Sequence, residues 1–288
     1  MAVLVPLLWT DPYLDEVKME RQVRRWRLDG KVDAFEIIST SEAGVLHCHP
    51  SFNIGAMIEG AASVTSGSMT HVQAPGAVVT LNAYQPHASA WSAAVNRYFV
   101  LHIDPAFWET RLQPELGADG QFAQPVCRDG LVFHYLLGLR DQLHKDPTSV
   151  SSDDIDLLLK LCRGRGLIRD HVDEEDPSLT PMNGADFREL FSEGDDMQEG
   201  QPRISNLAEQ VGMSRYQFSR LCSQTAGMQP RRLRLQLMVA RAQKAINEGQ
   251  DLASASLHAG FSDQSHMNRE FRRTIGMTPR EYQSAGRG

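Results

Sequence analysis

The last third of the chain carries the same pattern twice, and this duplication limits what the chain can fold into. The first copy lies over 207–230 and the second over 255–279, with one extra residue inside the second. The corresponding positions are Gly212/Gly260, Ser214/Ser262, Phe218/Met267, Arg220/Arg269, Cys222/Phe271, Gly227/Gly276, Met228/Met277 and Pro230/Pro279. A repeat of this kind indicates one supersecondary unit that is built twice.

Each copy has the features of a helix-turn-helix unit. The glycine can adopt the left-handed conformation that a tight turn after a helix needs. The serine two residues later can cap the next helix, and Ser214 with Gln217 has the spacing of a capping box. In that next helix, apolar residues four positions apart are expected to face the core, namely Phe218 with Cys222 and Met267 with Phe271.

The opposite face of the second helix is polar in both copies, which is typical of a helix that reads DNA in the major groove. The predicted DNA-binding residues are Arg215, Tyr216, Ser219 and Arg220 in the first copy and Asp263, Gln264, Ser265, Asn268, Arg269 and Arg272 in the second. Arginine can hold guanine through two hydrogen bonds or pair with a phosphate. An ordinary surface arginine is the alternative, and the equivalent positions of Arg220 and Arg269 favour the DNA contact.

One helix is predicted to join the two copies, from Pro230 to about Glu248. Proline suits the first turn of a helix, and Gly249 suits its end. Its buried stripe is expected at Leu233, Leu237, Ala240 and Ala245. At about 1.5 Å per residue the helix spans about 28 Å, close to the roughly 34 Å of one DNA turn. One chain could therefore place two recognition helices in successive major grooves.

The charge of the chain is divided in the same way. Residues 201–288 hold thirteen Lys and Arg against six Asp and Glu, while the rest of the chain holds sixteen against thirty. A basic module on an acidic body suits nucleic-acid binding, because phosphate neutralisation supplies most of the non-specific affinity. Residues 171–200 hold ten acidic residues and one basic residue, so we expect a linker that stays away from DNA.

The region from about Ile204 to Ala285 resembles the AraC/XylS-type transcription regulators. The second copy carries the most specific part of the resemblance: Gly260-Phe261, Gln264-Ser265, Arg269, Phe271-Arg272-Arg273, Gly276, Thr278-Pro279 and Tyr282. The resemblance implies two helix-turn-helix subdomains on a rigid helix, with the base-reading positions at the residues named above, Arg272 excepted. One departure is that His258 and Ala259 precede Gly260, where the family is usually more apolar.

The first half of the chain has the pattern of a small barrel or sandwich. Short strand-like runs separated by glycines are typical of this architecture, and they lie at 34–39, 45–49, 53–59, 77–81 and 98–103. After Asp129 the spacing becomes helical, at Leu131, Tyr135, Leu139 and Leu143 and again at Ile155, Leu158, Leu159 and Cys162. We expect these two helices to pack on the barrel, with a dimer surface as the alternative.

His47-Cys48-His49, Pro75-Gly76 with the run to Asn82, and Pro86-His87 resemble the cupin-like sensing domain that many of these regulators carry. The resemblance implies a β-barrel whose interior holds a small effector. The predicted ligand-binding residues are His47, His49, Phe52, Met57, His87, Trp91 and His102.

A metal is the alternative occupant of this barrel. In catalytic cupins an HxH pair, an acidic residue and a later histidine bind a metal ion. Here Phe52 and Asn53 stand where the acidic residue is expected. We therefore favour no metal and no cofactor, and keep a zinc or iron site on His47, His49 and His87 as the alternative.

Together these patterns predict an α+β chain. Residues 1–170 form a cupin-like β-barrel with accessory helices that binds an effector and could dimerise, 171–200 form the acidic linker, and 201–288 form an all-α domain of two helix-turn-helix units. The expected function is sequence-specific transcription regulation in response to a small molecule, without enzyme activity. The alternatives are a metal-dependent cupin enzyme fused to a DNA-binding module and a constitutive, architectural DNA-binding protein.

The expected partners are double-stranded DNA, a small-molecule effector, a second copy of the chain and RNA polymerase, with no membrane. Four scattered cysteines form no CxxC pair, and we interpret no segment as a signal peptide or membrane span. The expected location is therefore the cytoplasm. The sequence leaves open the effector, the operator and whether the protein activates or represses.

Overall fold

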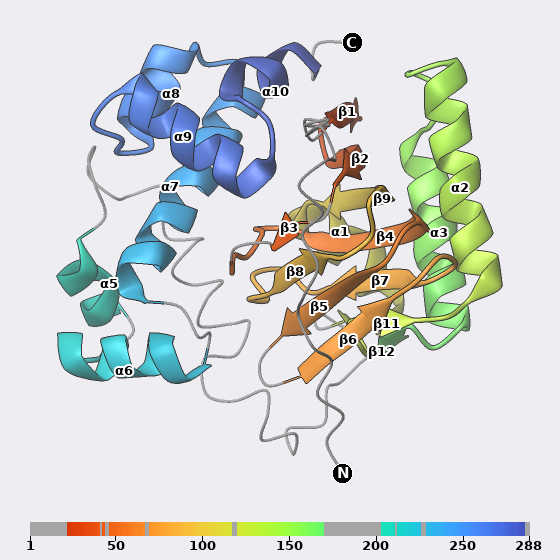
Figure 1. Ribbon diagram of the computed structural model, residues 1–288, viewed down its shortest axis with the longest axis horizontal. Helices are drawn as coiled ribbons and strands as arrows, with labels where there is room; N and C mark the ends of the chain where they lie inside the picture. Colours follow the sequence, from red (N-terminus) through yellow and green to blue (C-terminus); the bar gives the residue numbers. More distant parts are fainter. Residues whose placement is uncertain are drawn as a thin grey trace, which may run out of the picture.

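The computed structural model describes residues 22–40, 42–43, 46–66, 69–116, 120–169, 203–210, 212–225 and 229–285. The predicted linker over 171–200 and the repeat positions Gly227 and Met228 lie outside these residues. A β-rich domain and a helical domain lie side by side (Figure 1). The α+β class predicted from the sequence is confirmed.

Two antiparallel sheets form the β-rich domain. The larger sheet has the order β1 (Gln22–Leu28), β2 (Val32–Ser39), β9 (Asn96–Ile103), β4 (Phe52–Glu59), β7 (Val78–Leu81) and β11 (Val126–Cys127). The smaller has the order β3 (Glu42–Ala43), β8 (Ala88–Trp91), β5 (Ala62–Ser66) and β6 (Met69–Gln73). A further short pair joins β10 (Gln121–Phe122) to β12 (Ile168–Arg169).

Four of the five predicted strands are confirmed, as β2, β4, β7 and β9. The strand predicted over 45–49 is wrong: in its described part only His47 pairs, through an isolated bridge to His87. Pairing stops after this bridge. The carbonyl of His49 accepts the backbone N–H of Tyr84 at 2.7 Å, while the backbone N–H of Gln85, the next residue in register, donates to Asn82. The remaining strands were not predicted from the sequence: β1, β3, β5, β6, β8, β10, β11 and β12.

A tight turn at Asp29 and Gly30 joins β1 to β2. Both residues have positive φ, 45° and 67°, as a type I′ hairpin turn requires. The Asp29 carboxylate also accepts the backbone N–H and the hydroxyl of Ser152, at 2.9 and 2.6 Å. The hairpin tip therefore caps the start of α3 (Ser152–Gly164).

Three helices pack on the β-rich domain: α1 (Pro105–Leu116), α2 (Gly130–Lys145) and α3, of which α2 and α3 lie on the flank opposite the helical domain (Figure 1). All four residues predicted to be buried on α3 are buried. On α2, Leu139 and Leu143 are buried as predicted, but Leu131 is exposed and Tyr135 half-buried. A strict spacing of four residues drifts around a helix of 3.6 residues per turn, and Val132 and Leu136 face the core instead.

The helical domain has the predicted double arrangement. The first unit comprises α5 (Ile204–Gln210) and α6 (Arg215–Thr225), and the second comprises α8 (Leu252–His258) and α9 (Gln264–Ile275). The joining helix α7 (Pro230–Asn247) has proline in its first turn, and α10 (Pro279–Ala285) follows the second unit. Gly212 and Gly260 turn the chain with φ of 65° and 86°, as predicted.

The helix caps differ between the two units. Ser214 and Gln217 form the predicted capping box, with reciprocal hydrogen bonds of 3.0 and 3.3 Å. In the second unit the predicted cap Ser262 is wrong. Asp263 caps α9 instead, and its carboxylate accepts the backbone N–H of His266 at 2.7 Å. The inserted residue of the second copy moves the cap by one position.

Helix α7 is the common core of both units. The buried residues Leu233 and Leu237 share a cluster with Phe218 and Cys222 of the first unit, as predicted. Met238, Val239 and Ala242 share another with Met267 and Phe271 of the second. Ala240 was predicted to be buried and is half-buried. The prediction assumed one buried stripe, whereas α7 buries one face against each unit.

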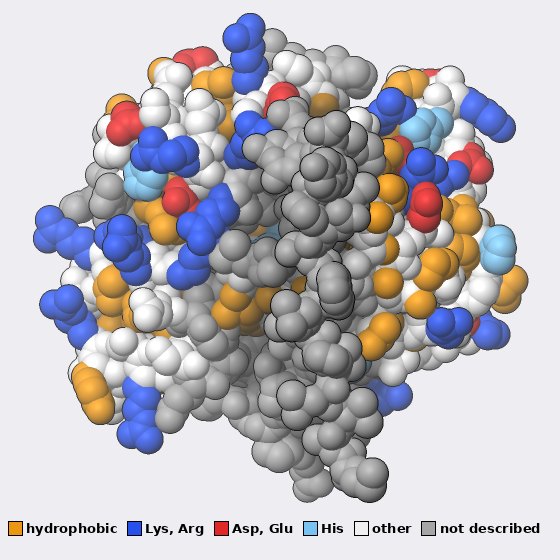
Figure 2. Space-filling view, in the orientation of Figure 1, with side chains coloured by type: hydrophobic (Ala, Val, Ile, Leu, Met, Phe, Trp, Pro, Cys, Tyr) orange, Lys and Arg blue, Asp and Glu red, His pale blue; other side chains and the backbone are white. Residues whose placement is uncertain are grey.

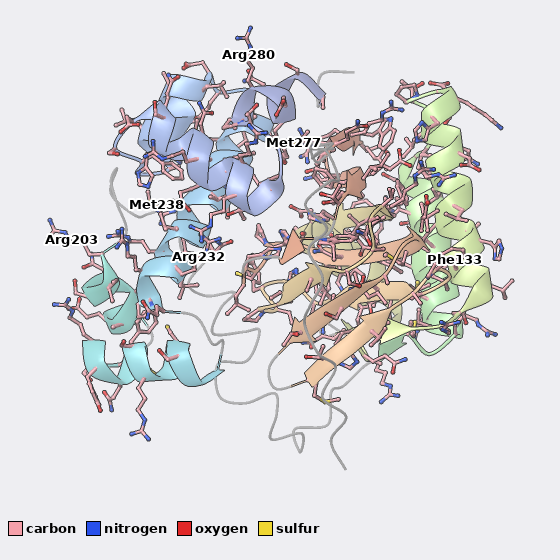
Figure 3. All side chains as sticks on the ribbon, in the orientation of Figure 1. Phe133, Arg203, Arg232, Met238, Met277 and Arg280 are labelled. Carbon is pink, nitrogen blue, oxygen red and sulfur yellow. The ribbon has the colours of Figure 1, made fainter. Side chains whose placement is uncertain are left out.

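The two domains meet through a buried polar network. The Arg25 guanidinium on β1 donates to Asp33 of β2 at 3.0 and 2.7 Å, to Asn247 of α7 at 2.8 Å and to the carbonyl of Tyr282 at 2.5 Å. It also lies 3.4 Å from the centroid of the Tyr282 ring, whose hydroxyl donates to Asp33 at 3.0 Å. Met277, labelled in Figure 3, is buried in one apolar cluster with Tyr282.

We expect Asp33→Asn to lower the free energy of unfolding by about 3–5 kcal/mol, because it leaves the buried Arg25 guanidinium without its charged partner. Urea unfolding followed by circular dichroism measures the change. Asp141→Asn is the control, since its pair with Arg140 is half exposed on the surface and is worth about 0–1 kcal/mol. Equal losses in the two variants would contradict the role of the network.

Candidate nucleic-acid interface and barrel cavity

A cavity of about 120 Å³ lies between the two sheets of the β-rich domain. The larger sheet contributes Phe35, Ile37, Asn53, Val79, Leu81, Tyr98, Val100 and His102. The smaller sheet and the chain beside it contribute His47, His49, Val64, Gln73, His87, Ser89 and Trp91. The wall is thus apolar along the strands, with a concentration of imidazole and amide groups.

Five of the seven predicted ligand-binding residues line this cavity, and Phe52 and Met57 do not. Phe52 lies on the other face of β4, where it stacks on Trp108 with ring centroids 4.1 Å apart. Met57 is fully buried in a small cluster with Ala62 and Ala77. The alternation of side chains along β4 turns Asn53, not Phe52, toward the cavity.

Four histidines come together in the cavity wall. The ring centroids of His47 lie 4.7 Å from His49 and 4.4 Å from His87, and those of His49 and His102 are 4.6 Å apart. The backbone bridge fixes part of this arrangement, since His47 and His87 exchange N–H···O bonds of 2.9 and 2.8 Å. One potential ligand atom from each of His47, His49 and His87 lies within 4.8 Å of the other two.

Burial keeps two of these imidazoles neutral. Desolvation lowers the pKa of His87 to about 4 and the pKa of His102 to about 4. His87 Nδ1 lies 3.0 Å from the carbonyl oxygen of Gln85, which can only accept, so the proton sits on Nδ1 and the Nε2 lone pair is available. These rings can accept hydrogen bonds or ligate a metal at neutral pH.

Tyr98 reaches the cavity across Gly55. A Cβ built on Gly55 would lie 2.3 Å from the Tyr98 hydroxyl oxygen and 2.6 Å from the carbonyl oxygen of Phe99, so only glycine fits. Burial raises the pKa of Tyr98, and its hydroxyl therefore stays protonated. An isolated glycine inside a strand pattern is a sequence signal for such a close approach.

The helical domain completes the cavity. Arg273, Thr274 and Ile275, the last residues of α9, line it together with barrel residues. Phe35 and Val100 of the barrel also share one buried cluster with Phe271 of α9. No spacing in the sequence reveals how two domains pack, so this contribution could not be predicted. The second helix-turn-helix unit is therefore part of the cavity wall.

The predicted DNA-reading face of the first unit is exposed. Arg215, Tyr216, Ser219 and Arg220 are all exposed on α6, with Tyr216 76% exposed. The first three line a surface groove together with Arg231 near the start of α7. Because the Tyr216 ring is exposed, it is available to contact a base edge or a sugar.

The predicted face of the second unit is also exposed, at Asp263, Gln264, Ser265, Asn268, Arg269 and Arg272. Asp263 differs from the other residues of this face, because its carboxylate caps the start of α9. The hydrogen bond from the His266 backbone N–H lowers the pKa of Asp263, so it stays ionised near neutral pH. Figure 2 shows Lys and Arg side chains gathered over the helical domain, to which α6 and α9 belong.

Two family models match the chain along most of its length. An AraC-like ligand binding domain matches residues 36–161, and a helix-turn-helix domain matches residues 207–285. The chain belongs to the AraC-type regulators. It is a DNA-binding transcription regulator with a ligand-binding domain, and the two matches fall on the two domains of the structure.

Curated relatives match part of this AraC-type regulator. The bifunctional transcriptional activator/DNA repair enzyme Ada of Escherichia coli is 32% identical over 89 residues, and the regulatory protein ada of Salmonella typhimurium is 30% identical over 89 residues. These matches cover 31% of the chain and 25% of each relative. The chain therefore spans about a quarter of the relatives' length.

Solved structures of similar fold cover both domains. ToxT from Vibrio cholerae O395 has a TM-score of 0.55 at 12% identity, over 94% of this chain and all of that one. ToxT from strain SCE256 with a bound unsaturated fatty acid has a TM-score of 0.54 at 14% identity, over 94% and 97%. At this identity the likeness establishes the fold.

Across the part of the chain that the structure describes, no helix combines the length and apolar character needed to cross a membrane.

We expect Gly55→Ala to lower the free energy of unfolding by about 1–3 kcal/mol, because the new methyl group must displace Tyr98 and the β9 backbone. The control is Gly138→Ala at an exposed site inside α2, where a Cβ meets nothing within 4 Å. That change should raise stability by up to about 1 kcal/mol through helix propensity. Thermal melts of both variants check the pair, and a stable Gly55→Ala protein would refute the close approach.

Proposed function

We propose that this chain is a sequence-specific regulator whose DNA affinity responds to a small molecule in the barrel cavity. The observation that carries the proposal is the double use of α9. Its first turns present the exposed residues Gln264, Ser265, Asn268 and Arg269, while its last turn lines the cavity. A ligand that contacts Thr274 or Ile275 would bind differently when α9 moves on DNA, and such a difference is what linkage requires.

The cavity supports a small, partly polar effector. Its polar groups include the histidines, Asn53 and Gln73, both buried, and the hydroxyl of Tyr98. Arg273 at the rim brings the positive charge of α9 to the mouth, and no carboxylate is among the lining residues that the structure describes. A compact molecule with hydrogen-bonding groups and a neutral or negative charge suits this surface.

Arg269→Ala should weaken binding to a preferred DNA sequence by about 1–3 kcal/mol if Arg269 reads a base. The DNA is first selected from a random pool of double-stranded oligonucleotides, and affinity is then measured by fluorescence anisotropy at fixed salt. A base contact predicts that binding to random DNA changes much less, whereas a phosphate contact weakens all sequences alike and lowers the salt slope.

Lys160→Ala is the matched control for this experiment. It removes one exposed positive charge from α3, on the flank away from the helical domain, and should leave DNA affinity unchanged. If Arg269→Ala retained full affinity for every DNA tested, the assignment of α9 as a reading helix would be wrong.

We also propose that α2 and α3 form a dimer surface. Each carries a large apolar side chain in solvent, Leu131 at 60% and Leu157 at 55% exposed, on the flank opposite the helical domain (Figure 1). Exposed apolar surface marks interaction sites, and α2 packs against α3 on this flank. A dimer through this flank would leave both DNA-reading faces open.

The double variant Leu131→Glu with Leu157→Glu should therefore sediment as a monomer under conditions where the wild-type chain sediments as a dimer. Like charges buried against each other across a symmetric interface are repulsive. Met69→Glu, which places the same charge on an exposed apolar residue of β6, should remain dimeric. A monomeric wild-type chain at tens of micromolar would refute the proposed surface.

A further inference from the structure

A short segment after each recognition helix is nearly identical in the two copies. Gly-Met-Gln-Pro-Arg occupies 227–231 and Gly-Met-Thr-Pro-Arg occupies 276–280. We propose that the arginine at the end of each segment, Arg231 in the first unit and Arg280 in the second, binds a DNA phosphate beside its recognition helix and so fixes the position of that helix in the groove. This inference rests on the proposed reading of DNA by α6 and α9.

The other shared residues of the segment have structural roles, as the second copy shows. Gly276 ends α9 with a φ of 88°, in the left-handed conformation that glycine favours. Met277 is buried in the core of the second unit, and Pro279 is buried in the first turn of α10. Arg280, by contrast, is exposed, and its side chain points away from the helical domain (Figure 3). Packing therefore explains the repeated Gly, Met and Pro but not the repeated Arg.

The first unit shows where this arginine lies relative to the reading face. Arg231 lines a surface groove together with Arg215, Tyr216 and Ser219, which belong to the exposed face of α6 that we propose for DNA. Pro230, directly before it, is buried and anchors the backbone at the start of α7. The guanidinium of Arg231 is therefore held beside the surface that α6 contacts.

Both arginines have their positive charge available. Among the residues that the structure describes, neither guanidinium takes part in a hydrogen bond or an ion pair. The acidic neighbour of Arg280, Glu281, caps α10 instead, and its carboxylate accepts the backbone N–H and the hydroxyl of Thr278 at 2.6 and 2.8 Å. In the first unit the next residue is Arg232, which pairs with Glu270 of α9 at 3.1 Å. A guanidinium without an acidic partner can bind a phosphate without giving up another ion pair.

A phosphate is the DNA group that these two positions suit. Neither arginine lies on a recognition helix, and each begins the helix that follows one. Contacts from such flanking positions reach the sugar–phosphate backbone, where they fix the register of the protein and carry no sequence information directly. Because Arg231 and Arg280 hold equivalent positions in the two units, their phosphates should be separated by about one DNA turn, or about 10 base pairs.

The test compares the wild-type chain with Arg231→Ala, Arg280→Ala and the double variant, on the selected DNA and on random DNA, by fluorescence anisotropy over a range of salt. Each phosphate contact releases about 0.9 counterions, so each single variant should lower the slope of log affinity against log salt by about 0.9. At about 0.1 M salt this corresponds to about eightfold weaker binding for each single variant and about 60-fold for the double variant. The preference for the selected DNA should not change.

Conservative variants and a distant charge supply the controls. Arg231→Lys and Arg280→Lys keep the positive charge and should retain the salt slope of the wild-type chain. Lys160→Ala on α3, which also removes one exposed charge, should leave affinity and slope unchanged. Circular dichroism melts establish that each variant is folded before its affinity is compared.

Ethylation of single phosphates locates each contact on the selected DNA. In the wild-type chain, ethylation should interfere with binding at phosphates in two places, about 10 base pairs apart. Arg231→Ala should abolish the sensitivity at one place and Arg280→Ala at the other, so that each arginine is assigned to its own phosphate.

An unchanged salt slope in the folded double variant would overturn the proposal. A loss of affinity confined to the selected DNA would also overturn it, because that pattern belongs to residues that read bases. If the wild-type chain showed no preference for the selected DNA, the proposed function would fail instead. The salt slopes on random DNA would then still decide whether the two arginines bind phosphates.

Discussion

The contact between the two domains depends on the buried guanidinium of Arg25. A charge without water must be fully paired, and here the partners come from both domains: Asp33 from the barrel, and Asn247 and the Tyr282 carbonyl from the helical domain. Separating the domains would leave Arg25 with Asp33 but without its other two acceptors. The network therefore favours one docked arrangement over a loose association, and apolar side chains such as Phe35 and Met277 close around it.

The contact between the two domains also completes the wall of the cavity. Without the helical domain the barrel would be open beside Phe35 and Val100, and with it the end of α9 becomes part of the wall. The same helix carries the polar face that we propose for DNA, and α7 holds it at a fixed distance from α6 by burying residues against both units. A ligand in the cavity could therefore act on α9 through direct packing contacts with its last turn.

The sequence predicted the helical domain well, because its signals are local. Glycine turns at Gly212 and Gly260, the Ser214 capping box and the apolar pairs on α6 and α9 all depend on residues within one or two turns. The inserted residue was visible, but its effect on the cap of α9 was not anticipated. In the barrel, the resemblance to cupins placed the histidines in the cavity wall, although the strand predicted over 45–49 is wrong, and Phe52 was placed on the wrong face of β4. The contribution of Arg273 to Ile275 could not be predicted, since it depends on two domains far apart in the sequence meeting in space.

The central claim is that one chain reads DNA with two recognition helices held apart by α7. The most direct measurement is the sequence pattern of the DNA that the full chain enriches from a random double-stranded pool, combined with footprinting of the enriched site. Two recognition helices on one chain should enrich two short conserved blocks whose centres are about 10 base pairs apart, protected on one face of the duplex. A single conserved block, or enrichment no greater than that of random DNA, would contradict it.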